Sequence, residues 1–108
     1  LDAGVSAVVA FDDTLALGLM SALTTRGVRI PGDLAIASFD DLSYSVLVRP
    51  AITSIAADPS ELAAAAQRML EAASTGQLES ASASVPAVLH LRASIGPVVA
   101  LDSRDGSL

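Results

Sequence analysis

Apolar residues form two kinds of run along this chain, and the two kinds alternate. Residues 6–11, 34–39, 51–57 and 85–94 are short, mostly apolar runs of strand length. Such runs are typical of strands that are buried on both faces. Two longer stretches with helical periodicity lie between them and end near Gly27 and Gly76. The pattern predicts strand, helix, strand, strand, helix, strand, with residues 98–101 as a candidate for a short edge strand.

The first helix is predicted to begin at an acid and to carry one apolar face. Asp13 is the expected N-cap, because its carboxylate can accept hydrogen bonds from the free amides of the first turn. Gly27 stands where a left-handed C-cap is expected, with Arg26 near the negative end of the helix. The apolar face is predicted at positions that recur with each helical turn: Leu15, Leu19 and Leu23, with Ala16 and Met20 beside them.

The second helix has a stronger start signal. Asp58 is its expected N-cap, Pro59 occupies the first helical position, and Glu61 can return a hydrogen bond to the cap. Its apolar face is predicted at Leu62, Ala66, Met69, Leu70 and Ala73. The alternation of elements predicts an α/β fold, with helices flanking a mostly parallel sheet. The 108 residues are too few for the two full halves of a doubly wound domain.

Two pairs of adjacent acids follow two of the predicted strands. Asp12 and Asp13 end the first strand, and Asp40 and Asp41 end the second. In a parallel sheet both pairs would lie at the carboxyl ends of strands, where such folds place their ligand crevice. These acids are therefore the first candidates for a functional site.

Charge and composition exclude several classes of function. Twelve acids stand against six arginines, lysine is absent, and the formal net charge is −6 with no basic stripe. Direct binding of nucleic acid by this chain is not expected. Cysteine is absent, and the lone His90 is expected to have no special role, so neither a metal nor a cofactor is predicted. No apolar run reaches the roughly 18 residues of a membrane span, and no membrane contact is expected.

Four short motifs follow one another in an order that is specific as a set. They are an acidic strand end leading to Ala16-Leu17-Gly18, the sequence RGVRIP at residues 26–31, the strand end Phe39-Asp40-Asp41, and PAITSI at residues 50–55 before the capped helix. Together they cover residues 7–94, most of the chain. This order resembles the effector-binding region of the lactose/galactose repressor (LacI/GalR) family of bacterial transcription regulators.

The resemblance implies a partial periplasmic-binding-protein-like (type I) fold, in which two α/β subdomains hold a sugar or similar small effector between them. Residues 1–108 would be a C-terminal fragment of the effector-binding domain. The resemblance also implies a non-enzymatic repressor in the cytoplasm, whose operator DNA is bound only through an N-terminal domain outside this chain.

Individual residues take their implied roles from the family's motifs. Asp12 occupies a position from which relatives contact effector, commonly as Asn, and Asp40 is the acid of the second strand end that also contacts it. A carboxylate can accept two hydrogen bonds from vicinal hydroxyls but cannot donate, so Asp12 would suit a hydroxyl-rich or cationic ligand. Asp13 is assigned to the helix cap and Asp41 to the backbone of the following loop.

The loop at residues 40–49 carries more apolar side chains than a solvated loop usually does. Relatives use the first helix and this loop in a dimer interface, which makes Tyr44, Leu47 and Val48 candidates for contact with a second copy. Plain packing on the domain is the alternative for these three residues. An effector and a homodimer partner are therefore the expected interactions.

Two enzyme classes also place acids at strand ends. A haloacid-dehalogenase-like phosphotransferase needs its two acids separated by one residue, whereas Asp12 and Asp13 are adjacent. A phosphoacceptor receiver domain holds magnesium with such acids, but it also uses a lysine near a later strand end, and this chain has none. Both stand as alternatives to the ligand-sensing role.

Overall fold

The computed structural model describes residues 4–77, 79 and 81–97. The predicted alternation of strands and helices is present, with one short 3-10 helix added in the loop after the second strand. The elements are β1 (Ala7–Val9), α1 (Asp13–Thr25), β2 (Ala35–Phe39), η1 (Ser43–Val46), β3 (Thr53–Ala57), α2 (Pro59–Ser74) and β4 (Ala87–His90). The edge strand expected at residues 98–101 lies outside the described residues. No helix of the described part is long and apolar enough to cross a membrane.

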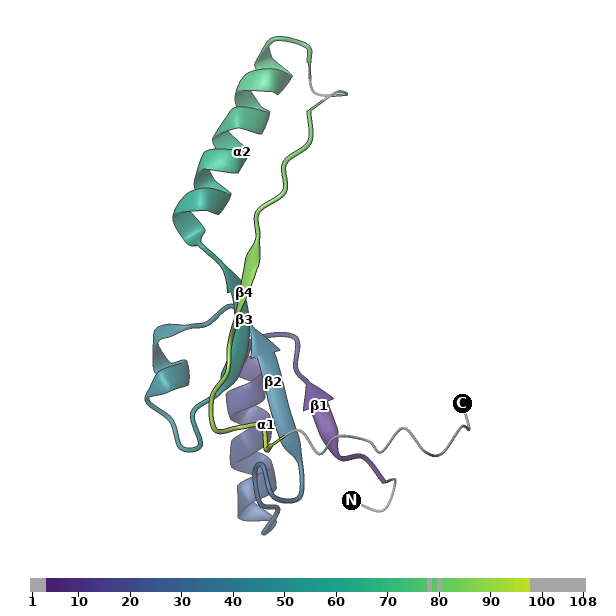
Figure 1. Ribbon diagram of the computed structural model, residues 1–108, viewed down its shortest axis with the longest axis vertical. Coiled ribbons are helices and arrows are strands. Elements are labelled where there is room, and N and C mark those ends of the chain that lie inside the picture. Colours follow the sequence, from purple (N-terminus) through teal and green to yellow (C-terminus); the bar gives the residue numbers. More distant parts are fainter. Residues whose placement is uncertain (1–3, 78, 80, 98–108) are drawn as a thin grey trace.

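The four strands form one sheet in chain order (Figure 1). β1 pairs with β2 and β2 with β3 in parallel, while β4 runs antiparallel to β3. Ala37 in the middle strand is opposite Val9 on one side and Thr53 on the other. The prediction of a mostly parallel α/β sheet is therefore confirmed.

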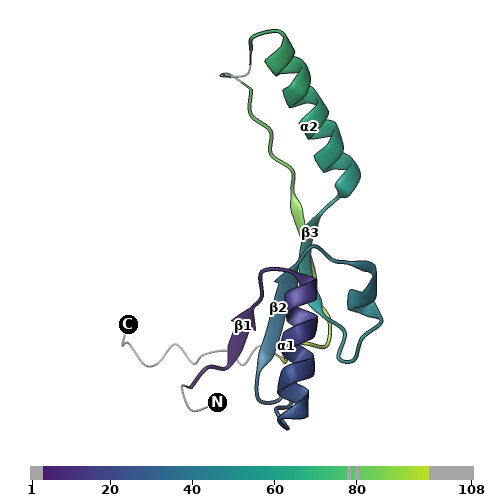
Figure 2. The same cartoon turned by 180° about the vertical axis from the view of Figure 1, so that it is seen from behind.

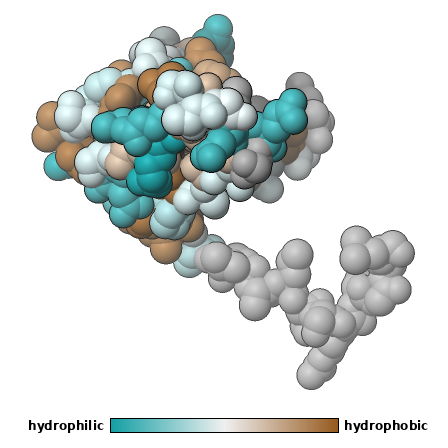
Figure 3. Space-filling model, turned by 90° about the horizontal axis from the view of Figure 1, so that it is seen from above, coloured by the Kyte–Doolittle hydropathy of each residue, from teal (hydrophilic) through white to brown (hydrophobic). Residues whose placement is uncertain are grey.

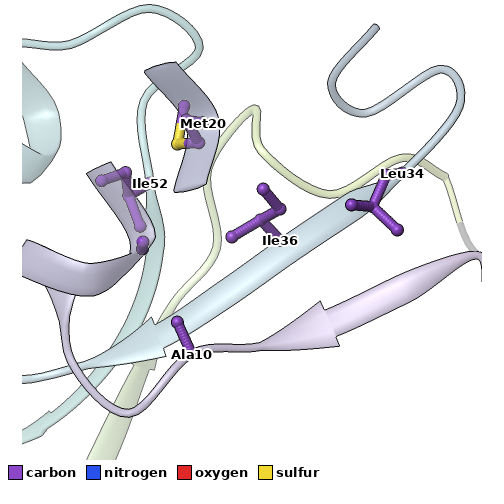
Figure 4. Packing of buried hydrophobic residues seen from close by; sticks show 6 residues of the cluster. Ala10, Met20, Leu34, Ile36 and Ile52 are labelled. Carbon is purple, nitrogen blue, oxygen red and sulfur yellow. The ribbon is translucent and has the colours of Figure 1, made fainter. Parts of the chain in front are cut away.

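Helix α1 covers one face of this sheet and builds the core with it (Figure 2). Ala16 and Met20 are its buried apolar side chains, and they pack with Ile36 and Ile52 of the sheet layer (Figure 4). Leu15, expected on the buried face, is instead 57% exposed. The buried stripe follows Asp13, Ala16 and Met20, one position further along the chain than Leu15 and Leu19.

The N-cap of α1 is Asp12, and the prediction of Asp13 is wrong. Asp12 has extended backbone, and its Oδ1 accepts a hydrogen bond from the amide of Leu15 at 2.7 Å. Asp13 is already the first helical residue, and its side chain is fully buried. An N-cap needs a non-helical backbone so that its side chain can turn back on the first turn, and only Asp12 meets that condition.

Helix α2 begins where the sequence indicated but does not pack on the sheet. Its N-cap is Asp58, whose carboxylate accepts from the amides of Ser60 at 2.7 Å and Glu61 at 3.3 Å. The helix then projects away from the sheet, beyond the β3–β4 pair (Figure 1). Leu62 and Leu70 of its predicted apolar face are 50% and 72% exposed. The expectation that both helices flank the sheet is thus met by α1 alone.

After β4 the chain continues to Ser94, which lies at the starts of β2 and β3. The Ser94 hydroxyl donates to the carbonyl of Ile36 at 2.5 Å and accepts from the amide of Thr53 at 2.8 Å. The Ser94 carbonyl also accepts from the Ile36 amide at 2.8 Å. This buried residue satisfies backbone groups where β2 and β3 begin. The strand predicted over residues 85–94 is therefore shorter, since β4 spans Ala87–His90 and Ser94 has this separate role.

Candidate functional site

A hollow of about 290 Å³ opens at the carboxyl ends of β2 and β3. Its walls come from the residues after β2, the end of β3, the start of α2 and β4. The lining residues are Asp40, Asp41, Ala56, Ala57, Asp58, Pro59, Val88 and His90. A second hollow of about 340 Å³, between α1 and residues 48–49, carries no acid among its lining residues. The acid-lined hollow is the candidate site, since it is the one at the strand ends where such folds bind ligands.

Asp40 and Asp41 enter this hollow from unusual backbone conformations. Their φ angles are 96° and 48°, in the left-handed region that residues other than glycine seldom adopt. The Asp40 amide donates to the carbonyl of Ile55 at 2.9 Å, and the Asp41 amide donates to the hydroxyl of Ser54 at 3.0 Å. Aspartate tolerates this region better than most residues, and strained positions of this kind cluster at functional sites.

Asp41 is paired with a cation and does not offer a free charge to the hollow. Oδ1 of Asp41 lies 2.6 Å from a guanidinium nitrogen of Arg92, and Oδ2 lies 3.4 Å from Nε2 of His90. The contact with Arg92 is electrostatic, because no group of the described residues donates a well-directed hydrogen bond to that oxygen. Arg92 is itself held by the carbonyl of Ile52 at 2.8 Å. The sequence predicts that Asp41 bonds the backbone of the loop, whereas the contacts found for its carboxylate among the described residues are those with Arg92 and His90.

Asp40 is the acid of the hollow whose charge is least compensated. It is exposed, and it takes part in no ion pair within the described residues. Asp58 is already used as the cap of α2, where the hydroxyl and amide of Ser60 and the amide of Glu61 hold its pKa below the ordinary value. The hollow therefore presents one uncommitted carboxylate beside a capped one.

Asp12 lies at the end of the neighbouring strand β1 but does not line this hollow. Its Oδ1 is used by the cap of α1, while its Oδ2 takes part in none of the hydrogen bonds found within the described residues. The structure thus groups Asp40 with Asp41, Asp58 and His90, and places Asp12 apart from them at the same edge of the sheet.

Asp13 forms a buried junction: its carboxylate joins α1 to β2, β3 and η1 through hydrogen bonds and is not placed to contact a ligand. Its Oδ1 accepts from the hydroxyls of Ser38 in β2 and Ser54 in β3, the latter at 2.7 Å. Its Oδ2 accepts from the hydroxyl of Ser45 in η1 and, at 2.8 Å, from the amide of Leu42. Burial disfavours the charged form of Asp13, but these four hydrogen bonds together outweigh it and lower the pKa of the carboxyl.

Comparison with known proteins decides the family of this fold. Residues 2–95 match the model of the periplasmic binding protein-like domain. The chain belongs to the periplasmic binding protein-like domain family. The HTH-type transcriptional repressor PurR of Vibrio cholerae serotype O1 is 38% identical to it over 55 residues, which are 51% of this chain and 16% of that protein.

Solved structures of LacI-family transcriptional regulators have the same fold. One from Enterococcus faecium, with bound ribose, is 28% identical with a TM-score of 0.74 and covers 90% of this chain and 37% of its own. One from Arthrobacter sp. FB24, in complex with lactose, is 28% identical with a TM-score of 0.72 and covers 85% and 36%. The resemblance to the LacI/GalR family is therefore confirmed, and the chain spans well under half the length of these relatives.

Three residues at or beside the candidate site are not assigned to it from sequence. His90 was expected to have no special role, yet it lines the hollow near Asp41. Arg92 compensates Asp41, and Asp58 both caps α2 and lines the hollow. The available signal was the pair of polar residues at 90 and 92 within a mostly apolar stretch, but only the antiparallel pairing of β4 with β3 brings them beside the acids.

The three candidates for a dimer interface have different surroundings in the fold. The Tyr44 hydroxyl lies 2.8 Å from the Thr14 hydroxyl of α1, which ties the loop to that helix. Leu47 is 74% exposed, whereas Val48 packs against the hydrophobic core. Leu47 is therefore the candidate with the most side chain available to a partner, and the interface itself stays a prediction.

Proposed function

We propose that this chain is the ligand-sensing part of a bacterial LacI-family transcription regulator, and that Asp40 contacts a small polyhydroxyl effector in the acid-lined hollow. The observation that supports this most directly is an uncommitted carboxylate at the strand ends of a fold whose relatives hold ribose and lactose. An ionised carboxylate can accept hydrogen bonds from two adjacent sugar hydroxyls, and charge-assisted bonds are the stronger kind.

Asp12 is proposed as a second effector contact. Its Oδ1 is used by the helix cap, so Oδ2 would meet the ligand. A carboxylate accepts hydrogen bonds but cannot donate them, which favours hydroxyl-rich or cationic ligands over anionic ones. In the intact regulator, bound effector shifts the angle between two subdomains and with it the spacing of DNA-binding heads in a dimer, so two distinct sites are coupled. A protein with that role acts in the cytoplasm.

We infer that the acids do not perform catalysis. An aspartyl nucleophile must reach its substrate, whereas Asp13 is fully buried and accepts four hydrogen bonds. Asp41 is paired with Arg92, and the described residues contain no group of three or more acids, histidines or cysteines able to hold a metal ion. The second acid of the phosphotransferase pair, Asp13, is therefore out of a substrate's reach, and the receiver alternative lacks a magnesium site in the described part.

A second copy of the chain is the proposed protein partner. Its contact would include Tyr44, Leu47 and Val48, joined by Leu15 of α1, which is 57% exposed. Exposed apolar side chains on one helix and the adjacent loop are suited to an interface. The operator DNA would be bound outside this chain, whose net charge of −6 opposes contact with phosphates.

A thermal-shift assay of the full-length protein with a panel of ribose, glucose, lactose and glucosamine tests the effector site. We expect at least one sugar to raise the melting temperature, and Asp40→Ala and Asp12→Ala each to reduce that shift. Asp33→Ala is the matched control, since Asp33 is an acid outside the hollow that pairs with Arg29. Retention of the full shift in both site variants would show that the site is wrongly placed.

A further inference from the structure

The backbone after β2 is held by three successive amides, each bonded to a different group. The Asp40 amide donates to the Ile55 carbonyl at 2.9 Å, the Asp41 amide to the Ser54 hydroxyl at 3.0 Å, and the Leu42 amide to Oδ2 of Asp13 at 2.8 Å. The chain therefore leaves β2 in a conformation fixed by β3 on one side and by α1 on the other.

This fixed conformation is one that the chain would not adopt unaided. Asp40 and Asp41 are consecutive residues with φ angles of 96° and 48°. Positive φ at a residue other than glycine costs free energy and persists only where the surroundings impose it. The amide contacts of residues 40–42 are the surroundings that do so here.

Two of these three contacts depend on the carboxylate of Asp13. Its Oδ2 accepts directly from the Leu42 amide. Its Oδ1 accepts from the Ser54 hydroxyl at 2.7 Å, and that hydroxyl in turn accepts from the Asp41 amide. Because a hydroxyl has a single proton, donating it to Asp13 orients the Ser54 oxygen lone pairs toward Asp41.

We propose that Asp13 is a positioning residue, which acts through the Ser54 hydroxyl and the Leu42 amide to hold Asp40 in the left-handed conformation that turns it into the hollow. Asp13 lies at the first position of α1, so the same carboxylate links the helix that follows Asp12 to the loop that carries Asp40. The two proposed effector contacts, on different strands, are thereby set in one rigid unit. This inference rests on the proposed function for its purpose, but its geometry stands without a ligand.

The chain offers a matched pair of variants for the test. Ser38 and Ser54 are both buried and both donate to the same oxygen, Oδ1 of Asp13. Of the two, Ser54 is the one that accepts from the Asp41 amide. Ser38→Ala and Ser54→Ala therefore each remove one hydrogen bond from Asp13, while Ser54→Ala alone also removes the contact with residue 41.

Hydrogen–deuterium exchange of the full-length protein, with fragmentation that resolves single residues, gives the readout. Relative to Ser38→Ala, we expect Ser54→Ala to exchange about tenfold faster at the Asp41 amide, which corresponds to loss of one hydrogen bond. Asp13→Ala is expected to speed exchange at the Leu42 amide as well as at the Asp41 amide, because it removes the acceptor of the first and the group that orients the Ser54 hydroxyl for the second. Equal exchange at residue 41 in the two serine variants would show that the Ser54 hydroxyl does not hold the Asp41 amide. Unchanged exchange at residues 41 and 42 in Asp13→Ala would overturn the proposal.

Titration of the same variants with ribose, glucose, lactose and glucosamine links positioning to binding. We expect Ser54→Ala to weaken the binding of any sugar that the unmodified protein holds by about tenfold, and Ser38→Ala to weaken it less. Faster exchange at the Asp41 amide with unchanged sugar affinity would overturn the proposal that Asp13 helps to present Asp40 to the sugar. If the unmodified protein binds none of these sugars, the proposed effector class fails, while the exchange result still decides whether Asp13 positions the loop.

Discussion

Asp12 and Asp13 are chemically identical neighbours that come to lie in opposite surroundings. Asp12 sits at the surface edge of the sheet and caps α1 through the Leu15 amide. Asp13 is fully buried and collects three serine hydroxyls and one amide. The carboxylate at the surface remains available to a ligand through one oxygen, and the buried one is saturated. Function at this scale depends on which hydrogen-bond donors each acid meets.

The Arg29–Asp33 pair gives a residue-scale prediction of pH dependence. The Arg29 side chain and amide donate to Asp33 and lower the pKa of that carboxyl to about 2. A lowered pKa means that the stabilisation is complete above the unfolded value of about 3.9 and is lost as the pH falls toward 2. We expect carbon NMR titration to give Asp33 a midpoint of about 2. Arg29→Ala should raise that midpoint without restoring the free value, because the amide of residue 29 still donates to Asp33.

Arg26→Ala is the control for this titration, because the Arg26 guanidinium donates to the Ala22 carbonyl instead of to Asp33. An Asp33 midpoint that stays near 2 after Arg29→Ala would mean that another group lowers its pKa.

Hydrogen bonds at the first turn of α1 fix the position of the helix. The helix starts where β1 ends, is capped by Asp12, and is fastened to β2, β3 and η1 by Asp13. Ala16 and Met20 then bury one stripe of the helix against the sheet. Cap, junction and core all depend on the same short stretch between residues 12 and 20.

Urea unfolding of two alanine variants separates the contributions at this helix start. We expect Asp12→Ala to lower the free energy of unfolding by about 1 kcal/mol, the usual cost of a lost N-cap. Asp13→Ala should cost about 3 kcal/mol or more, because it leaves buried hydroxyls and an amide without their acceptor. Equal losses in the two variants would contradict the assignment of Asp12 as cap and Asp13 as junction.

The whole molecule is long and open for its size. Its radius of gyration is 18.8 Å, against about 13 Å for a compact domain of this length. Helix α2 stands clear of the sheet, and hydrophobic side chains remain on the surface among hydrophilic ones when the molecule is seen from the α2 end (Figure 3). Val9, Phe39 and Leu89 of the sheet are also exposed, at 65%, 42% and 51%. This shape leaves apolar surface that a further layer of protein would cover.

The isolated chain is therefore expected to associate with itself. Light scattering after size-exclusion chromatography should give a mass above that of one chain, 10.8 kDa, because exposed apolar patches of this extent favour association. The double variant Leu62→Glu and Leu70→Glu should lower that mass, while Ala64→Glu, on the same helix but outside the predicted apolar face, should not. A monomer at high concentration would show that these surfaces do not drive association.

Local signals in the sequence determined the element order, the α/β class, the start of α2 at Asp58 and the placement of acids at two strand ends. These features depend on backbone geometry and hydrophobic periodicity, which neighbouring residues set among themselves. The family followed from the order of motifs along the chain. The place of Asp40 in the hollow could be predicted because a strand end in a parallel sheet fixes it, and its role as an effector contact stays a prediction.

The tertiary structure alone decided which acid of the first pair caps α1, that His90 and Asp58 share the hollow with Asp40, and that Arg92 pairs with Asp41. Two adjacent aspartates can cap a helix equally well. Asp13 became the buried acid because serines from 25 to 41 residues away donate to it, which left the cap to Asp12. His90 and Arg92 reach the acids only because β4 folds back antiparallel on β3. The tertiary structure also decided that α2 does not pack on the sheet. Periodicity in the sequence shows that a helix has an apolar face, but it does not show what that face contacts.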